Sequence, residues 1–260
     1  MTNEPFFRKD AQGRFHPTRV GIGPWTGTSL HGRLIIGLLG AEIERQYRTP
    51  DYMPSRLTVD MYKLPDLSPV EVVTRVVKDG YRIKVVDAEF ISGGESAGRA
   101  TCQLLRRTEN PPGNVWTSPN WEAPKPADIA PPQDQRGGLG GMWQVRQIAG
   151  GFGQPGMPRR IWMAEVRELV EGEPFTPFAR VATAADFVSP FANSGDQGLA
   201  YINSDATIYM HREPVTDWIG FEVTGHGATD GVAVAECRLY DEQGAIGSAS
   251  CTALAQKRKV

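Results

Sequence analysis

The chain has 260 residues, of which 40% are hydrophobic and 22% are charged, and its formal net charge at pH 7 is −2. This composition indicates a globular protein, and the near-neutral charge argues against a general nucleic-acid-binding protein. No apolar stretch approaches the roughly 20 residues that cross a membrane, and residues 1–5 show neither the basic start nor the apolar core of an export signal. Three cysteines without CxxC spacing predict reduced thiols in the cytoplasm, and neither a metal nor a cofactor is expected.

The amino-terminal half predicts one long helix followed by a series of strands. Residues 18–25 are expected to form a short strand ending at Pro24, and Ser29 is a candidate cap for a helix that runs to Arg48. The first half of this helix is apolar on nearly every side, as expected for a helix that a sheet surrounds. Runs rich in Val, Ile and Thr then predict strands near residues 55–63, 69–78, 81–92 and 96–108. A buried helix followed by an antiparallel meander is an α+β plan.

Prolines dominate residues 109–137, which predict an extended linker that Trp116 and Trp121 attach to the body of the protein. The second half repeats the earlier mixture of helix and strands. Its pattern predicts strands at 142–148 and 159–169, an Ala-rich helix near 178–189 that ends at Ser189-Pro190, and strands at 204–212, 217–225, 231–241 and 245–256.

The two halves also share markers at one constant spacing, which indicates a duplicated module. The pairs that lie 149 positions apart are Met61 and Met210, Pro65 and Pro214, and Cys102 and Cys251. We therefore expect an amino-terminal copy over residues 1–108, the linker over 109–137, and a carboxyl-terminal copy over 138–260. The copies should pack as a pseudo-dimer with a binding site at the seam.

Residues 94–98 (Gly-Glu-Ser-Ala-Gly) match the GxSxG sequence of the nucleophile elbow in α/β-hydrolases. That motif needs a strand before the serine and a helix behind it. Here both flanks alternate with the period of a strand, so the motif is predicted to lie at the tip of a hairpin. A serine esterase that uses Ser96 is kept as an alternative function.

Three segments carry a resemblance to a known family. Residues 30–33 (Leu-His-Gly-Arg) open the long helix, residues 54–60 resemble the second strand of the family, and the third segment runs from Tyr201 to Asp205 and on through residues 211–212 and 217–220. These segments and the duplicated plan are similar to the double-hotdog acyl-CoA thioesterases of the thioesterase II type. The resemblance implies a double hotdog, in which each of two tandem copies wraps an antiparallel sheet around a long central helix.

The resemblance also implies which residues form the site. In this family a helix start polarises the thioester carbonyl, and His31, in place of a family glycine, Gly32 and Arg33 would lie beside the substrate. Gly32 suits this place because a glycine lets a ligand approach the backbone closely. His31 could contact a ligand phosphate or simply cap the loop. Asp205 corresponds to the family's aspartate, which acts as the general base on water.

The remaining family positions are matched less well. The family's hydroxyl residue falls on Thr224 or a neighbour, with His226 nearby as a further substrate contact. Its glutamine falls on Cys251 or Thr252, so the glutamine itself is absent and either residue would be a different donor.

The leading hypothesis is an acyl-CoA thioesterase of lipid metabolism that releases free CoA and a carboxylic acid. The same fold without catalysis would give an acyl-CoA-binding protein. The expected ligand is an acyl-CoA, no nucleic-acid or membrane partner is expected, and further association into a homo-oligomer through sheet edges is expected.

Overall fold

The computed structural model describes residues 3–132, 141–154, 156 and 158–256. The amino-terminal half begins with a short hairpin, continues with the long helix and ends with four antiparallel strands. Its elements are β1 (Phe7–Lys9), β2 (Phe15–Pro17), the 3-10 turn η1 (Arg19–Gly21), α1 (Gly32–Tyr47), β3 (Tyr52–Met61), β4 (Val70–Asp79), β5 (Ile83–Ser92) and β6 (Glu95–Arg106). Of these strands, β4, β5 and β6 form a meander and β3 pairs with β6.

The carboxyl-terminal half follows the same order, with the helix broken in two. Its elements are η2 (Pro126–Asp128), β7 (Trp143–Ala149), β8 (Arg160–Glu165), α2 (Pro177–Ala185), α3 (Val188–Asn193), β9 (Ser194–Gly195), β10 (Gly198–Leu199), β11 (Tyr201–Asn203), β12 (Asp205–Met210), β13 (Ile219–Thr229), β14 (Val232–Asp241) and β15 (Gly244–Ala255). An antiparallel hairpin, a helical segment and a meander therefore occur twice.

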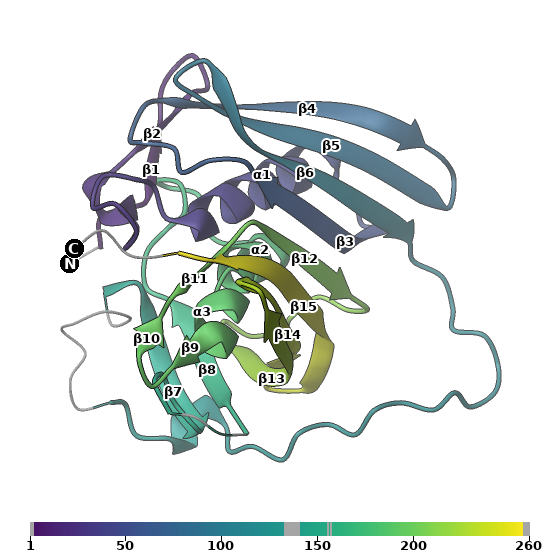
Figure 1. Ribbon diagram of the computed structural model, residues 1–260. Helices are drawn as coiled ribbons and strands as arrows, with labels where there is room; N and C mark the ends of the chain where they lie inside the picture. Colours follow the sequence, from purple (N-terminus) through teal and green to yellow (C-terminus); the bar gives the residue numbers. More distant parts are fainter. Residues whose placement is uncertain (1–2, 133–140, 155, 157, 257–260) are drawn as a thin grey trace.

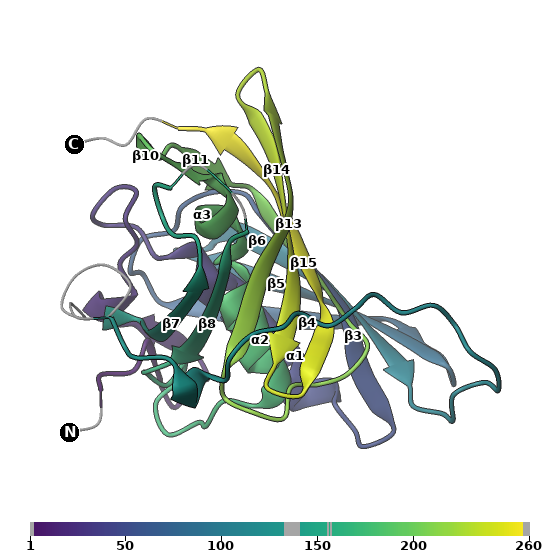
Figure 2. The ribbon, with the colours of Figure 1, turned by 90° about the horizontal axis from the view of Figure 1, so that it is seen from below.

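One long antiparallel sheet joins the two halves. Its strand order is β1-β2-β4-β5-β6-β3-β12-β15-β14-β13-β8-β7, so β3 and β12 meet at the centre. Figures 1 and 2 show the sheet curving around the helices, with α1 beneath the amino-terminal strands and α2 and α3 beneath the carboxyl-terminal strands. This arrangement confirms the predicted α+β double hotdog.

The strand register confirms the 149-residue repeat. Thr58 lies opposite Thr101 in the β3–β6 ladder, and the corresponding residues Thr207 and Ser250 lie opposite each other in the β12–β15 ladder. Thr58 and Thr207 also face each other across the β3–β12 seam, where their hydroxyl oxygens are 3.3 Å apart. Equivalent residues that meet at the centre of a sheet indicate a pseudo-twofold axis at this point.

Helices α1 and α2 pack closely because α1 carries glycines on the face that contacts α2. Residues 33–40 are all buried. A Cβ atom at Gly37 would overlap the Thr183 hydroxyl of α2, and a Cβ at Gly40 would lie 2.7 Å from the Ala182 Cβ. The apolar helix with internal glycines is thus explained by a helix–helix contact beneath the sheet.

Three expectations need correction. Residues 18–25 do not form a strand, because Gly21 and Gly23 fold back onto the start of α1 through hydrogen bonds with His31 and Ser29. His31, rather than Ser29, is the N-cap residue of α1. The helix expected at 178–189 is broken between α2 and α3, and Pro190 lies inside the first turn of α3, where its missing N–H group breaks no helical bond.

The described part of the linker is attached through one of its two tryptophans. The Trp121 ring stacks on Tyr240 with a centroid distance of 4.1 Å and contacts Trp162 edge-on. Trp116 is 80% exposed, so the prediction that it attaches the linker is wrong. Residues 133–137 of the expected linker lie outside the described residues, and the copy boundaries at 108 and 138 stay predictions.

Candidate active site

The amino end of α1 lies at the seam between the two halves, beside the break between α2 and α3. The Nδ1 atom of the cap residue His31 lies 3.3 Å from Oδ2 of Asp186, which follows directly after α2. Asn203, at the end of β11, donates from Nδ2 to Oδ1 of Asp186 over 2.9 Å. Segments of both halves therefore converge on one carboxylate.

The Asp186 carboxylate is held ionised although its side chain is only 6% exposed. Burial alone would raise the pKa of Asp186, but hydrogen bonds from His31 and Asn203 and the charge of Arg33 outweigh burial and lower that pKa below its usual value. The first N–H groups of α1 have no partner within the helix and form the positive end of its dipole. The site thus combines a buried negative charge with helix N–H donors.

The close approach of α1 to the Asp186 carboxylate requires a glycine at position 32, the first residue of the helix. A Cβ atom there would lie 3.1 Å from Oδ1 of Asp186 and 3.3 Å from the Met61 sulfur. Both contacts are tighter than ordinary van der Waals separation. The absence of a side chain at Gly32 therefore lets α1 begin directly against the carboxylate.

Two cavities open beside His31. The smaller, of about 160 Å³, is lined largely by apolar side chains such as Ile35, Met61 and Ile202, and also by Gly32, Lys63, Asp186, Asn203 and Ser204. The larger, of about 470 Å³, is mainly apolar, and its lining includes Ile22, Pro24, Met142, Trp143, Phe152 and Phe187. His31 lines both cavities, and Asp186 lines only the smaller one.

Asp205 occupies a different place from the one expected for it. It lines neither of these two cavities. Its Oδ1 accepts a hydrogen bond from the Thr252 backbone N–H over 2.6 Å and another from the Thr252 hydroxyl. Strand β15 pairs with β11 on one side of this contact and with β12 on the other. The carboxylate therefore fills a gap in the sheet, and the carboxylate at the amino end of α1 is Asp186.

The predicted catalytic residues Thr224 and Cys251 and the predicted substrate contact His226 also line neither of the cavities beside His31. Thr224 is exposed at a bulge in β13, and His226 places Nε2 2.9 Å from Oδ1 of Asn193 in α3. Cys251 is 3% exposed, and burial, with the charges of Asp186 and Asp205, raises the pKa of its thiol to about 12. The thiol is therefore protonated and enclosed in the core.

Arg33 does not reach a cavity. Its side chain is fully buried, forms an ion pair with Glu165, and lies with its guanidinium carbon 4.1 Å from the Trp143 ring centroid. The expectation that Arg33 contacts substrate therefore needs correction. Its charge acts within the core, where it stabilises the Asp186 carboxylate.

Ser96 is the second residue of β6, opposite Ile91 of β5, and β6 begins directly after the tight turn at Gly93 and Gly94. Both flanks of the GxSxG sequence are strands, as predicted, so the strand–turn–helix context of a nucleophile elbow is not formed. The buried Ser96 hydroxyl has no hydrogen-bond partner among the described residues.

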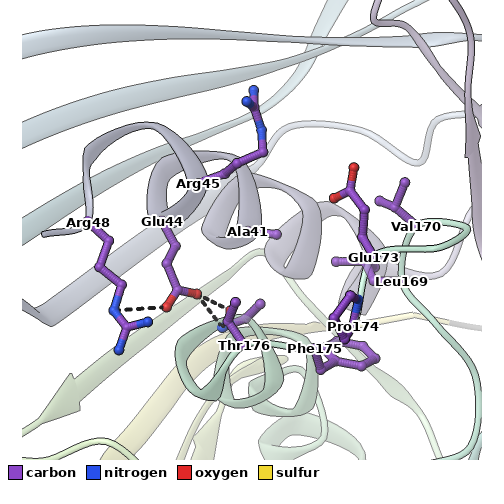
Figure 3. A pocket seen from close by; sticks show the side chains of 11 residues that line it. Ala41, Glu44, Arg45, Arg48, Leu169, Val170, Glu173, Pro174, Phe175 and Thr176 are labelled. Carbon is purple, nitrogen blue, oxygen red and sulfur yellow. Dashed lines mark hydrogen bonds and ion pairs between the residues drawn. The ribbon is translucent and has the colours of Figure 1, made fainter.

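A further cavity of about 270 Å³ lies at the opposite end of α1 (Figure 3). Its buried carboxylate is Glu44, which accepts hydrogen bonds from the Thr176 hydroxyl and from the Ala179 N–H, the latter over 3.2 Å. Burial raises the pKa of Glu44. Because Thr176 is the N-cap residue of α2 and Ala179 lies in its first turn, Glu44 helps to cap that helix.

The structure reveals one site residue that the sequence reasoning missed. Asp186 is the single acidic residue between 177 and 193, an otherwise mainly apolar segment. An isolated carboxylate in a segment expected to be buried is costly unless it is paired or functional, which is the signal that could have identified it.

Comparison with known proteins places this architecture in a family. Models of the acyl-CoA thioesterase N-terminal domain and C-terminal domain match residues 22–105 and 121–254, respectively. The chain therefore belongs to the double-hotdog acyl-CoA thioesterase family of the thioesterase II type. A search of curated proteins finds no match.

Solved structures agree in fold. A tesB protein of Mycobacterium avium subs paratuberculosis is 15% identical, with a TM-score of 0.70 and 96% of each chain covered. An acyl-CoA thioesterase II, TesB2, of Mycobacterium marinum is 14% identical, with a TM-score of 0.67, covering 96% of this chain and 95% of that one. A hot dog protein of unknown function from Alicyclobacillus acidocaldarius is 16% identical, with a TM-score of 0.73 and coverage of 95% and 94%. Within the described residues, no helix combines the length and apolar character needed to span a bilayer.

Proposed function

We propose that this protein hydrolyses the thioester of an acyl-CoA to free CoA and a carboxylic acid at the amino end of α1. The observation that carries the proposal is the ionised, buried Asp186 held against the start of α1, in the smaller of two cavities that His31 lines. Membership in the acyl-CoA thioesterase family supports the same reaction.

The arrangement suits thioester hydrolysis in three respects. The larger cavity offers an apolar environment for an acyl chain, while the smaller one offers polar groups for the thioester and the adjoining part of CoA. The N–H groups at the start of α1 would stabilise the negative charge that develops on the carbonyl oxygen. Asp186 supplies the negative charge that favours removal of a proton from water.

Two carboxylates compete for this role, Asp186 from the geometry and Asp205 from the family resemblance. Asp186 is favoured because it lines the cavity beside Gly32, whereas Asp205 is engaged by Thr252. Asp186→Asn should lower kcat by about 10²–10⁴-fold, because the substitution keeps the shape and removes the charge. KM should change little, since substrate affinity would come from other contacts.

The experiment combines thiol release from a panel of acyl-CoAs with a binding measurement on the same panel. Asp10→Asn is a matched control, because Asp10 also pairs with a histidine but lies on the surface near His16. Loss of activity in Asp205→Asn and not in Asp186→Asn would reverse the assignment. Binding without thiol release would make the protein an acyl-CoA-binding protein.

A further inference from the structure

We propose that Nε2 of His31 is the atom that removes the proton from the attacking water, and that Asp186 acts on the reaction through His31. This inference rests on the thioester hydrolysis proposed above and specifies its general base. The base would then be an Asp–His pair assembled across the seam, with the histidine from the amino-terminal half and the carboxylate from the carboxyl-terminal half.

The surroundings of Nδ1 determine which ring nitrogen carries the hydrogen. Nδ1 lies 3.3 Å from Oδ2 of Asp186 and 3.4 Å from the backbone nitrogen of Arg33. One nitrogen cannot donate to the carboxylate and accept from the N–H group in the same tautomer. A lone pair on Nδ1 would face the Asp186 carboxylate and be repelled by it, so the hydrogen belongs on Nδ1 and is donated to Asp186. The lone pair of the neutral ring is then on Nε2.

Nε2 is available to a substrate-bound water. Among the described residues it has no hydrogen-bond partner, whereas the corresponding atoms of His16 and His226 are bonded to Asp10 and Asn193. The His31 side chain is 14% exposed and lines both cavities. The ring is held edge-on to Trp143, with centroids 6.3 Å apart, while Asp186 holds its other side. Two contacts thus orient a base whose side chain lines both cavities.

The backbone beside His31 supplies the second half of the site. Gly32 lines the smaller cavity together with His31, and its N–H group lies in the first turn of α1, where it has no partner within the helix. This N–H group is therefore the donor available to an oxyanion. The base and an oxyanion donor thus come from adjacent residues.

The proton and electron balance is that of a simple hydrolysis. Nε2 takes a proton from water as the water oxygen bonds to the thioester carbonyl carbon, and the carbonyl π electrons move to its oxygen. When the carbonyl re-forms, the carbon–sulfur bond breaks and its electron pair leaves on sulfur. The thiolate takes the proton from the imidazolium, which restores neutral His31 and gives free CoA and a carboxylic acid. Asp186 remains ionised throughout and stabilises the imidazolium.

Two substitutions at position 31 separate catalysis from capping. Asparagine is a favoured N-cap residue, so His31→Asn should preserve the start of α1 but remove the base. We expect kcat to fall by about 10²–10³-fold with KM changed little. His16→Asn, which disrupts the surface histidine–aspartate pair, is the control and should retain wild-type kcat. If Asp186 removed the proton directly, His31→Asn would retain kcat within a few-fold, and the proposal would be overturned.

Chemical rescue distinguishes a histidine that transfers a proton from one that only supports the structure. In His31→Gly, added imidazole should restore part of the lost kcat with saturation, and it should not restore Asp186→Asn. Thermal melting of each variant checks that the fold is intact. Loss of activity in His31→Gly without rescue in a folded protein would refute the role of Nε2. If the wild-type protein hydrolyses no acyl-CoA, both the proposed function and the role of His31 are refuted. If the wild-type protein is active and the His31 variants are equally active, only the role of His31 is refuted.

Discussion

Gly32→Ala tests the tight packing at the start of α1 without removing any functional group. The new Cβ would lie 3.1 Å from Oδ1 of Asp186, whose carboxylate is buried and held by His31 and Asn203. The carboxylate must therefore move by a few tenths of an ångström. This shift would misalign the Asp186–His31 contact, although every residue of the proposed site remains present.

The expected effect is larger on catalysis than on stability. Because a displacement of about 1 Å can cost about 10²-fold in rate, a shift of a few tenths should lower kcat by about 3–10-fold. The alanine also restricts the unfolded chain, which stabilises by about 0.4–1 kcal/mol and offsets part of the strain. The melting temperature should consequently stay within about 3 °C of wild type.

Steady-state thiol release and thermal melting on the same preparation measure both quantities. Gly227→Ala is the matched control, because a Cβ at Gly227 meets no atom within 4 Å and its backbone has no positive φ. The reasoning is refuted if Gly32→Ala keeps wild-type kcat in a stably folded protein, because the close approach of α1 to Asp186 would then not govern the rate.

The remaining predictions concern groups outside the proposed centre. Asp205→Asn should keep kcat within a few-fold but destabilise by about 1 kcal/mol in urea titration, because the Thr252 bonds lose a charged acceptor. Ser96→Ala should also keep activity within a few-fold, and covalent labelling of Ser96 by a fluorophosphonate would contradict this. At Asp241, burial alone would raise the pKa, but the Arg212 guanidinium and backbone N–H groups outweigh it and lower that pKa. As the pH falls, the Asp241 carboxylate is therefore protonated in the unfolded chain before it is protonated in the folded protein. The stabilisation that the ionised Asp241 gives to the fold is complete above about pH 4, the usual aspartate pKa. It is lost as the pH falls through the lowered pKa of the folded protein. Arg212→Leu should cost about 2 kcal/mol at pH 7 and less at acid pH, as measured by urea unfolding across the pH range.

Much of the fold could be predicted because its signals are local. Alternation along the strands and the Asp-Gly and Gly-Gly turns indicated β4, β5, β6, β13, β14 and β15 with small boundary errors. The repeated spacing of Cys102 and Cys251 then gave the relation between the halves, which the strand register confirms. Each of these signals comes from neighbours in sequence or from a constant offset.

The failures occur where distant contacts decide local structure. Residues 18–25 look extended, yet Gly21 accepts a bond from His31 and is drawn to the start of α1. The break between α2 and α3 cannot be read from helix propensity, since Asp186 and Phe187 keep right-handed helical backbone angles. Only the position of α1 explains why the chain presents Asp186 there.

The site was harder to predict than the fold for the same reason. Asp205 stands at the head of a strand, where the family resemblance directed attention, but the strand pairing assigns its carboxylate to Thr252. Asp186 and His31 are separated by more than half of the chain and meet because the two copies pack together. A seam site depends on that packing and has no signature in either copy alone.

The duplication also explains why one helix start is suited to the proposed reaction and its counterpart is not. α1 and α2 pack in opposite directions, so the start of each faces the far end of the other. At the start of α2, Pro177 has no N–H group, and the carboxylate of Glu44 already accepts a hydrogen bond from the Ala179 N–H. At the start of α1, glycine exposes the backbone, and the facing carboxylate is engaged by a histidine instead of by the helix N–H groups. Two copies of one fold have therefore diverged so that a carboxylate caps one helix start and serves a cavity at the other.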